Sequence, residues 1–326
     1  MANKPAFGTA EANRERVRDQ LNAVIHEVSR VIRGKREIIR DVLTAMVAGG
    51  HVLLEDVPGV GKTTLAKTMA RALNLTFSRI QFTSDLLPSD IVGVQVYRRT
   101  KEIFEFEQGP IFSQLVLADE INRTTPKTQS SLLEAMNEGT VSVYKQTHKL
   151  PEPFTVIATQ NPLDFQGPYP LPESQLDRFM FRLSIGYPDQ SVEHEILAAA
   201  DKSVQLDEIR PAQSTTLISD AHDCLSGVLV SDIVRDYLLR IVLATRTHPE
   251  VKVGISTRAA VAYQRAVKAR AFLDGRDFVT PDDVKGLAQC TLGHRIKLRD
   301  RTTSLSHGDE SQRVLMNILN AVDPPL

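Results

Sequence analysis

Apolar positions in the first half of the chain follow two different spacings. Between residues 17 and 31 they recur at helical intervals, which predicts an amphipathic helix, and residues 37–48 and 64–73 are predicted to be helical as well. Short, continuous apolar runs lie between and after these helices, at residues 51–54, 115–118 and 154–158. Such runs are typical of strands buried on both faces. The alternation predicts an α/β fold built on a doubly wound parallel sheet.

Residues 85–111 interrupt this alternation. The segment contains Pro88, Gly93 and Gly109, and its stretch Ile103-Phe104-Glu105-Phe106 alternates apolar and charged side chains. This composition predicts an inserted hairpin with loops rather than a core helix.

The pattern changes again after Tyr187-Pro188-Asp189. From residue 192 onward almost all apolar spacing is helical, and Thr280-Pro281-Asp282-Asp283 is typical of a helix start. Threonine caps the helix there, proline fits its first turn, and the acids face the positive end of its dipole. We therefore predict two domains, an α/β domain at residues 1–188 with an insertion near 85–110, and a helical domain at residues 189–326.

Composition narrows the class of protein. The 326 residues are 42% hydrophobic, which supplies a core and argues against a disordered or fibrous chain. The formal net charge is -1, so nothing global points to a polyanion such as nucleic acid as the partner. Cys224 and Cys290 are far apart and lack metal-ligand spacing, which fits a reducing compartment. No apolar run has the length of a membrane span, so we expect a soluble, cytoplasmic protein.

A phosphate-binding loop is predicted directly after the first strand, where the chain reads Glu55-Asp56-Val57-Pro58-Gly59-Val60-Gly61-Lys62-Thr63-Thr64. Residues 58–64 can surround phosphates with backbone N–H groups, while Lys62 reaches the terminal phosphates and the Thr63 hydroxyl ligates Mg²⁺. Asp56 stands where the Walker A pattern has its first glycine, and we expect it to make the turn because aspartate tolerates unusual turn geometry. The alternative is a Gly-Pro turn before an ordinary helix.

Two adjacent carboxylates follow the run at residues 115–118. Asp119 is placed to hold Mg²⁺, and Glu120 is placed to polarise an attacking water molecule. Phosphoryl transfer depends mainly on positioning and charge neutralisation, which two carboxylates and a cation can supply. The alternative is that this pair only begins a surface turn or helix.

Asn161 follows the run at residues 154–158, at the same predicted edge of the sheet. Its uncharged amide can orient the water between Glu120 and the terminal phosphate. An ordinary Asn-Pro turn, formed with Pro162, is the alternative.

Four motifs in this order resemble the MoxR family of AAA+ ATPases: Gly59-Val60-Gly61-Lys62-Thr63, Leu117-Ala118-Asp119-Glu120-Ile121-Asn122-Arg123, Ala158-Thr159-Gln160-Asn161-Pro162 and Leu176-Asp177-Arg178-Phe179. The resemblance covers most of the chain and includes Gly254-Ile255-Ser256-Thr257-Arg258. It implies an AAA+ P-loop domain with a C-terminal α-helical lid, ATP or ADP and Mg²⁺ as ligands, and a homo-oligomer, most simply a hexameric ring.

The resemblance also implies individual roles. Asp119 corresponds to the Walker B magnesium residue, Glu120 to the catalytic glutamate and Asn161 to sensor 1. Arg178 corresponds to the arginine finger that reaches the ATP of a neighbouring subunit, and Arg258 to the sensor 2 arginine that contacts phosphate from the lid.

Other interpretations remain open for the residues that the resemblance singles out. Arg178 can instead form a surface ion pair with Asp177 or Glu173, and Arg123 is a second candidate for a contact across the subunit boundary. Ile32 and Gly34 are implied to line the adenine pocket, or else they are simple linker residues between helices.

The implied function is chaperone-like remodelling, assembly or activation of protein or metalloenzyme clients, with a von Willebrand factor A domain protein as a candidate partner. The insertion either contacts the client or packs its apolar residues on the body. Two other functions compete. A nucleic-acid motor or loader requires a basic stripe, whereas the insertion mixes cations with acids: Arg98, Arg99, Lys101, Glu102, Glu105 and Glu107. A nucleotide-controlled binding platform with little hydrolysis is disfavoured by the presence of Glu120 and Arg178.

Overall fold

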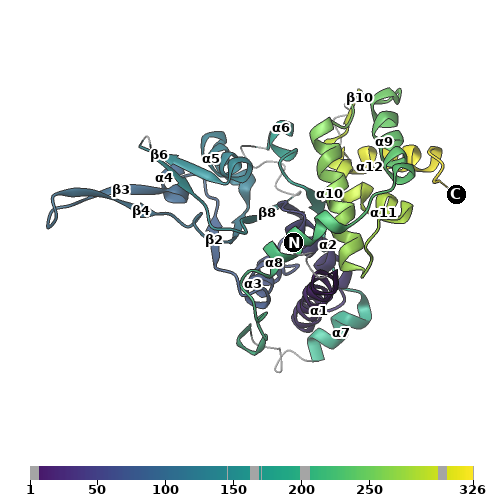
Figure 1. The fold of residues 1–326 in the computed structure, drawn as a ribbon. Helices are drawn as coiled ribbons and strands as arrows, with labels where there is room; N and C mark the ends of the chain where they lie inside the picture. Colours follow the sequence, from purple (N-terminus) through teal and green to yellow (C-terminus); the bar gives the residue numbers. More distant parts are fainter. Residues whose placement is uncertain are drawn as a thin grey trace, which may run out of the picture.

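The computed structural model describes residues 7–144, 146–161, 169, 171–198, 206–299 and 307–325. A parallel five-stranded sheet with the order β2-β5-β8-β1-β9 forms its centre (Figure 1). The strands are β1 (Val52–Glu55), β2 (Phe77–Gln81), β5 (Leu115–Asp119), β8 (Thr155–Gln160) and β9 (Phe181–Leu183). The predicted doubly wound parallel sheet is confirmed.

Side chains of the central strands alternate between two hydrophobic cores, one on each face of the sheet. Leu54 and Leu117 join the core formed with α1 (Phe7–Val31), α2 (Arg36–Val47) and α3 (Lys62–Ala72). Leu53 and Val116 join the core formed with α5 (Pro126–Glu138). Successive strand residues point to opposite faces, so a strand covered on both faces needs an apolar residue at every position. This explains the continuous apolar runs.

Two antiparallel hairpins extend the α/β part of the molecule. The first pairs β3 (Gly93–Arg98) with β4 (Ile103–Gln108), follows the short helix α4 (Pro88–Val92), and projects away from the body (Figure 1). It is the predicted inserted hairpin. The second pairs β6 (Thr140–Val143) with β7 (Gln146–Lys149) after α5, and the apolar pattern did not predict it.

The remaining helices lie between β8 and the C-terminal end. The short helix α6 (Glu173–Leu176) precedes β9, and α7 (Gln190–Ala198) and α8 (Leu217–Cys224) follow it. The lid consists of α9 (Asp232–Thr247), α10 (Thr257–Leu273), α11 (Pro281–Leu292) and α12 (His307–Ala321), with β10 (Val251–Val253) and β11 (Lys297–Leu298) as a small antiparallel pair. Short 3₁₀ turns occur at Ile121–Arg123, Leu206–Glu208, Leu225–Gly227 and Gly293–Arg295.

One hydrophobic core runs without interruption from α1 to the lid. Side chains of α8 and the lid helices belong to the same buried cluster as those of α1 and α2. The domain boundary at residue 188 therefore stays a prediction, because burial does not separate the chain there. None of the helices among the described residues is both long and apolar enough to span a membrane.

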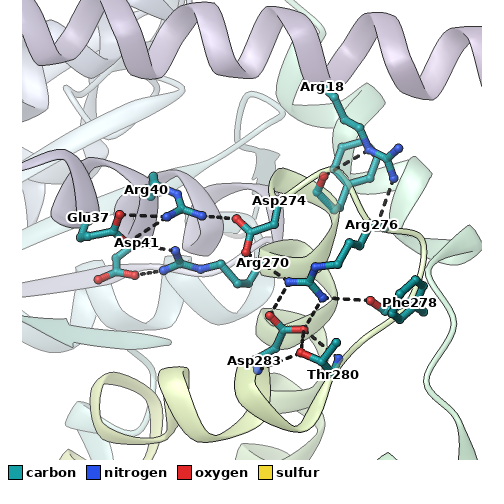
Figure 2. A network of polar contacts seen from close by, with 11 residues as sticks. Arg18, Glu37, Arg40, Asp41, Arg270, Asp274, Arg276, Phe278, Thr280 and Asp283 are labelled. Atoms are coloured by element: carbon teal, nitrogen blue, oxygen red, sulfur yellow. Dashed lines mark hydrogen bonds and ion pairs between the residues drawn. The ribbon is translucent and has the colours of Figure 1, made fainter.

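Charged side chains also join α2 to the lid (Figure 2). Arg270 of α10 pairs with Asp41 of α2 and lies 3.5 Å from the carboxylate of Glu37. Arg40 of α2 pairs in turn with Asp274, which follows α10. The arginines and acids alternate across the boundary, so the packing of lid on α2 is ionic as well as apolar.

Helix α11 begins where the sequence predicted. The Thr280 hydroxyl accepts a hydrogen bond from the N–H of Asp283 at 3.4 Å, and the Asp283 carboxylate accepts one from the N–H of Thr280 at 2.8 Å. This reciprocal cap satisfies two helix-end donors. Arg276 adds two hydrogen bonds to the same carboxylate, at 2.6 and 2.7 Å. These bonds lower the pKa of Asp283 against the opposing effect of its burial.

Candidate active site

The loop after β1 has the backbone that phosphate binding requires. Gly59 and Gly61 have φ angles of 91° and 93°, and a Cβ atom built at either position meets no other atom within 4 Å. Glycine is therefore needed for the conformation rather than for lack of space. Gly61 caps α3, so the first N–H groups of that helix point into the loop and attract anions.

Asp56 does not work as we expected. It has no positive φ, and its buried carboxylate accepts hydrogen bonds from three groups beyond β9: the Ser184 hydroxyl at 2.8 Å and the N–H groups of Ile185 and Gly186 at 2.5 and 3.0 Å. Its role is therefore to tie the phosphate-binding loop to the segment after β9. A glycine could not make these bonds.

Lys62 lies over its own loop. Its ammonium group donates hydrogen bonds to the carbonyl oxygens of Asp56 at 2.5 Å and Val57 at 3.2 Å. Burial lowers the pKa of Lys62, while the carboxylates of Asp56, Asp119 and Glu120 act in the opposite direction. The lysine thus faces both acids of the second motif.

A buried threonine joins the two acids at the end of β5. The Thr159 hydroxyl donates to Oδ1 of Asp119 at 2.6 Å and accepts from the N–H of Glu120 at 2.9 Å. The other carboxylate oxygen of Asp119 accepts two hydrogen bonds from Arg79 of β2, at 2.6 and 3.0 Å. Thr159 was not among the predicted site residues, although a threonine in an otherwise apolar strand beside the acids was a usable signal.

Glu120 is held in a left-handed backbone conformation with φ 58°. Such a conformation is uncommon for a residue with a side chain and is found at sites where side chains must be aimed. Its carboxylate accepts a hydrogen bond from the Gln81 amide at 3.0 Å and pairs with Arg123 at 2.9 Å. Arg123, our second candidate for a contact between subunits, thus pairs within the chain.

These motifs meet at one cavity of about 330 Å³ at the carboxyl edge of β1, β5 and β8. It is lined by Pro58, Gly59, Gly61, Lys62, Thr63, Thr64, Asp119, Glu120 and Asn161. A phosphate chain requires hydrogen-bond donors, which the ammonium group and the open backbone N–H groups supply. A hard divalent cation requires oxygen ligands, which the hydroxyl and the two carboxylates supply. The residues therefore fit ATP with Mg²⁺, which Thr63 and Asp119 would hold.

Three of the predicted nucleotide-binding residues are not among those that line this cavity. Val60 and Ile32 pack against the main hydrophobic core. Gly34 forms the turn between α1 and α2 with a φ of 70°, and its Cα faces Val192 of α7.

Arg178 and Arg258 lie in a second cavity, of about 450 Å³, between the lid and the α5 side of the sheet. They line it together with Arg265, Arg295 and Asn137, while Lys62 and Glu120 line the first cavity. Arg178 donates to the carbonyl oxygen of Leu133, and Arg258 donates to Oδ1 of Asn137 at 2.6 Å. The structure thus groups the two arginines with each other and not with the phosphate-binding loop.

Asp177, one of the two acids considered as a partner of Arg178, forms its ion pair with a different arginine. Asp177 pairs with Arg295 of the lid at 2.7 Å. The side chain of Glu173, the other acid considered, and Pro162, which completes the third motif, lie outside the described residues.

Comparison with known proteins gives a consistent result. Residues 51–181 match the ATPase family associated with various cellular activities (AAA), and residues 243–315 match the AAA lid domain. A solved structure from Cytophaga hutchinsonii, described as a candidate ATPase, superposes with a TM-score of 0.89 at 37% identity, covering 98% of this chain and 99% of that one.

Two curated relatives match this chain over most of its length and most of their own. The uncharacterized protein YeaC of Bacillus subtilis is 44% identical over 97% of this chain and 98% of its own. The chaperone MoxR1 of Mycobacterium tuberculosis is 41% identical over 85% of this chain and 76% of its own. With its lid and nucleotide-binding motifs in place, the chain belongs to the MoxR family of AAA ATPases.

Proposed function

We propose that the chain hydrolyses ATP as a ring of identical subunits, most simply a hexamer, and couples hydrolysis to the remodelling, assembly or activation of protein or metalloenzyme clients. The relative named chaperone MoxR1 supports the remodelling role. The resemblance adds a von Willebrand factor A domain protein as a candidate partner.

The residues of the first cavity divide the chemistry among them. Backbone N–H groups of residues 59–64 and the ammonium of Lys62 bind the phosphates. Thr63 and Asp119 would hold Mg²⁺, which would supply charge neutralisation on the terminal phosphates. Glu120 polarises the attacking water, and Asn161 orients it.

The division of acids and arginines between two cavities is the observation that carries the ring proposal. Negative charge on the phosphates must be stabilised as the terminal bond breaks, and arginine is suited to this task. Arg178 and Arg258 line a cavity other than the one that contains Lys62. This separation supports a role for both arginines at the nucleotide of a neighbouring subunit.

The β3–β4 hairpin supports a protein client rather than nucleic acid. Its tip exposes apolar side chains, with Tyr97 49% and Phe104 67% exposed, and their rings contact each other. Two of its three cations, Arg98 and Lys101, pair with Glu105 on the hairpin itself, and the hairpin carries as many acids as cations. An exposed aromatic tip on a hairpin without net positive charge suits a protein surface better than a phosphate backbone.

The test is the ATPase rate per subunit as a function of protein concentration, with the mass measured by light scattering in ADP and in a slowly hydrolysed ATP analogue. We expect the specific rate to rise as the mass shifts from monomer to ring, because each site needs its neighbour. A constant specific rate from a protein that stays monomeric would reject the ring and favour a nucleotide-controlled binder.

A further inference from the structure

The guanidinium group of Arg295 is nearly fully enclosed at the boundary between the lid and the sheet. Arg295 ends the 3₁₀ turn after α11, and its side chain is 5% exposed. Buried arginines are normally satisfied by acceptors on all sides, because an unmatched N–H group in such a place is costly. The acceptors of Arg295 therefore show what it holds.

Every N–H group of this guanidinium has an acceptor. Nε donates to Oδ1 of Asp177 at 2.7 Å, and Nη2 donates to the carbonyl oxygens of Asp177 at 3.0 Å and Phe179 at 2.9 Å. Nη1 donates to the carbonyl oxygen of Met180 at 3.4 Å and to that of Thr291 in α11 at 2.5 Å. A planar fork with five donors matches this set, whereas a lysine ammonium has only three.

Four of the five acceptors belong to the short segment 177–180, which joins α6 to β9. This segment carries Arg178, whose side chain lies in the second cavity with Arg258. The neighbouring His294 adds a further contact between its ring nitrogen Nε2 and the carbonyl oxygen of Phe179, at 3.0 Å. His294 and Arg295, directly after α11, thus contact the backbone on both sides of Arg178. The side chain of Arg178 is not part of these contacts and lines the second cavity.

We propose that Arg295 is a positioning residue that fastens the segment carrying Arg178 to the lid, so that Arg178 and Arg258 are presented to the neighbouring subunit as one unit. The inference rests on the proposed function, since it assigns Arg295 to the shared site of the ring. A shift of the lid must either carry segment 177–180 with it or break these hydrogen bonds. The position of Arg178 therefore depends on the position of the lid.

The first test is Arg295→Gln in the full chain. We expect kcat to fall roughly tenfold or more, since a displaced arginine no longer stabilises the transition state, while the affinity for a fluorescent ADP analogue stays within about twofold. Asp177→Ala removes one acceptor and leaves the three carbonyl contacts of the segment, so it should lower kcat less and keep the fold. A wild-type kcat in both variants would overturn the proposal.

Arg313→Gln is the matched control. Arg313 is also a lid arginine in an ion pair, but its side chain is 62% exposed and pairs with Glu250, at 3.0 Å, rather than with segment 177–180. We expect its kcat to equal that of the unmodified protein. A comparable loss of kcat in this variant would mean that any lid ion pair matters, which contradicts a specific role for Arg295.

Mixing subunits separates positioning across the boundary from damage within one subunit. Arg295→Gln subunits keep their own first cavity, so mixing them with Glu120→Gln subunits, which keep Arg178 in place, should restore part of the activity. Arg178→Ala subunits mixed with Glu120→Gln subunits serve as the reference. Recovery in the reference but not with Arg295→Gln rejects the Arg295 proposal alone. No recovery in either mixture rejects the shared site itself.

Discussion

The hydroxyl of Thr159 in β8 lies 2.6 Å from Oδ1 of Asp119 in β5, and Thr159 is fully buried. Because the Thr159 hydroxyl oxygen also accepts the N–H of Glu120 at 2.9 Å, one side chain orients both acids of the site. A hydrogen bond to a charged carboxylate is stronger than one between neutral groups. We therefore expect Thr159 to act on catalysis through Asp119 and Glu120 without lining the cavity itself.

Thr159→Val keeps the shape of the side chain and removes its hydroxyl. We expect kcat to fall on the order of tenfold and the free energy of unfolding to fall by about 2 kcal/mol, because a buried carboxylate and a buried N–H lose their partner. Steady-state ATPase assays and urea unfolding measure the two effects. Thr159→Ser, which restores the hydroxyl, is the control. A Val variant that keeps full activity, or a Ser variant that loses as much as the Val variant, would contradict this role.

Lys62 and Glu120 should differ in the step that they affect. Lys62→Ala removes the charge that meets the phosphates, so nucleotide affinity should fall roughly tenfold or more. Glu120→Gln keeps the size and loses the base, so the variant should bind ATP normally and hydrolyse it slowly. Calorimetric binding of ADP and single-turnover hydrolysis separate the two steps. Equal loss of affinity in both variants would show that the assigned roles are wrong.

Much of the first cavity was predictable because its residues follow strands that contain continuous apolar runs. The apolar runs at β1, β5 and β8 predict buried parallel strands, and parallel strands bring their carboxyl ends to one edge of the sheet. The two edge strands, β2 and β9, could not be predicted in this way. In β2, Ser78, Arg79 and Gln81 break the apolar run, and β9 has only three residues.

Contacts between distant parts of the chain could not be read from local patterns. Asp56 bonds to groups 128 to 130 residues further along, and Arg295 lies 118 residues from Asp177. The grouping of Arg178 with Arg258 likewise depends on how the lid packs on the sheet. Spacing along the sequence carries no information on such packing, which the three-dimensional arrangement alone reveals.

Arg79 should compete with Mg²⁺ for Asp119. Its guanidinium lies on Oδ2 of that carboxylate at 2.6 Å, so a cation bound there must displace or share it. Arg79→Gln should therefore lower the Mg²⁺ concentration that gives half-maximal ATPase activity by about threefold, because a like charge is removed from the metal site. A magnesium titration at saturating ATP measures the shift. An increase in the required Mg²⁺ would instead show that Arg79 supports the metal-bound state.

The ionic contact between α2 and the lid should stabilise the fold (Figure 2). Arg270 and Asp41 are 11% and 19% exposed, so Arg270→Gln leaves a largely buried carboxylate without its partner. We expect the free energy of unfolding to fall by about 2 kcal/mol or more. Arg235→Gln is the control, because its pair with Asp232 is exposed, and such pairs contribute less than about 1 kcal/mol. Equal losses of unfolding free energy in the two variants, measured by urea unfolding, would contradict a stabilising role for the buried Arg270–Asp41 pair.

His51 should make the fold sensitive to acid. Burial lowers its pKa to about 4, and Nδ1 accepts the N–H of Val156 at 3.0 Å while Nε2 donates to the carbonyl oxygen of Met136 at 2.9 Å. A proton on Nδ1 would therefore meet another donor. In the unfolded chain the pKa is about 6.5, so the unfolded state binds more protons between roughly pH 4 and 6.5. Stability then rises with pH in this window and is lost as pH falls.

His51→Gln isolates this contribution, because glutamine keeps one donor and one acceptor but does not titrate. The variant should be less stable at neutral pH, where the fit of the imidazole ring is lost. Below about pH 6.5 the difference should narrow by at most ~1.4 kcal/mol for each pH unit, since only the unmodified protein gains a proton on unfolding. Other groups titrate in both proteins and cancel in the comparison, including His294, whose burial also lowers its pKa. Urea unfolding of both proteins from pH 7 to 5 gives the difference directly, and a constant difference would mean that His51 stays neutral in the unfolded chain or charged in the folded one.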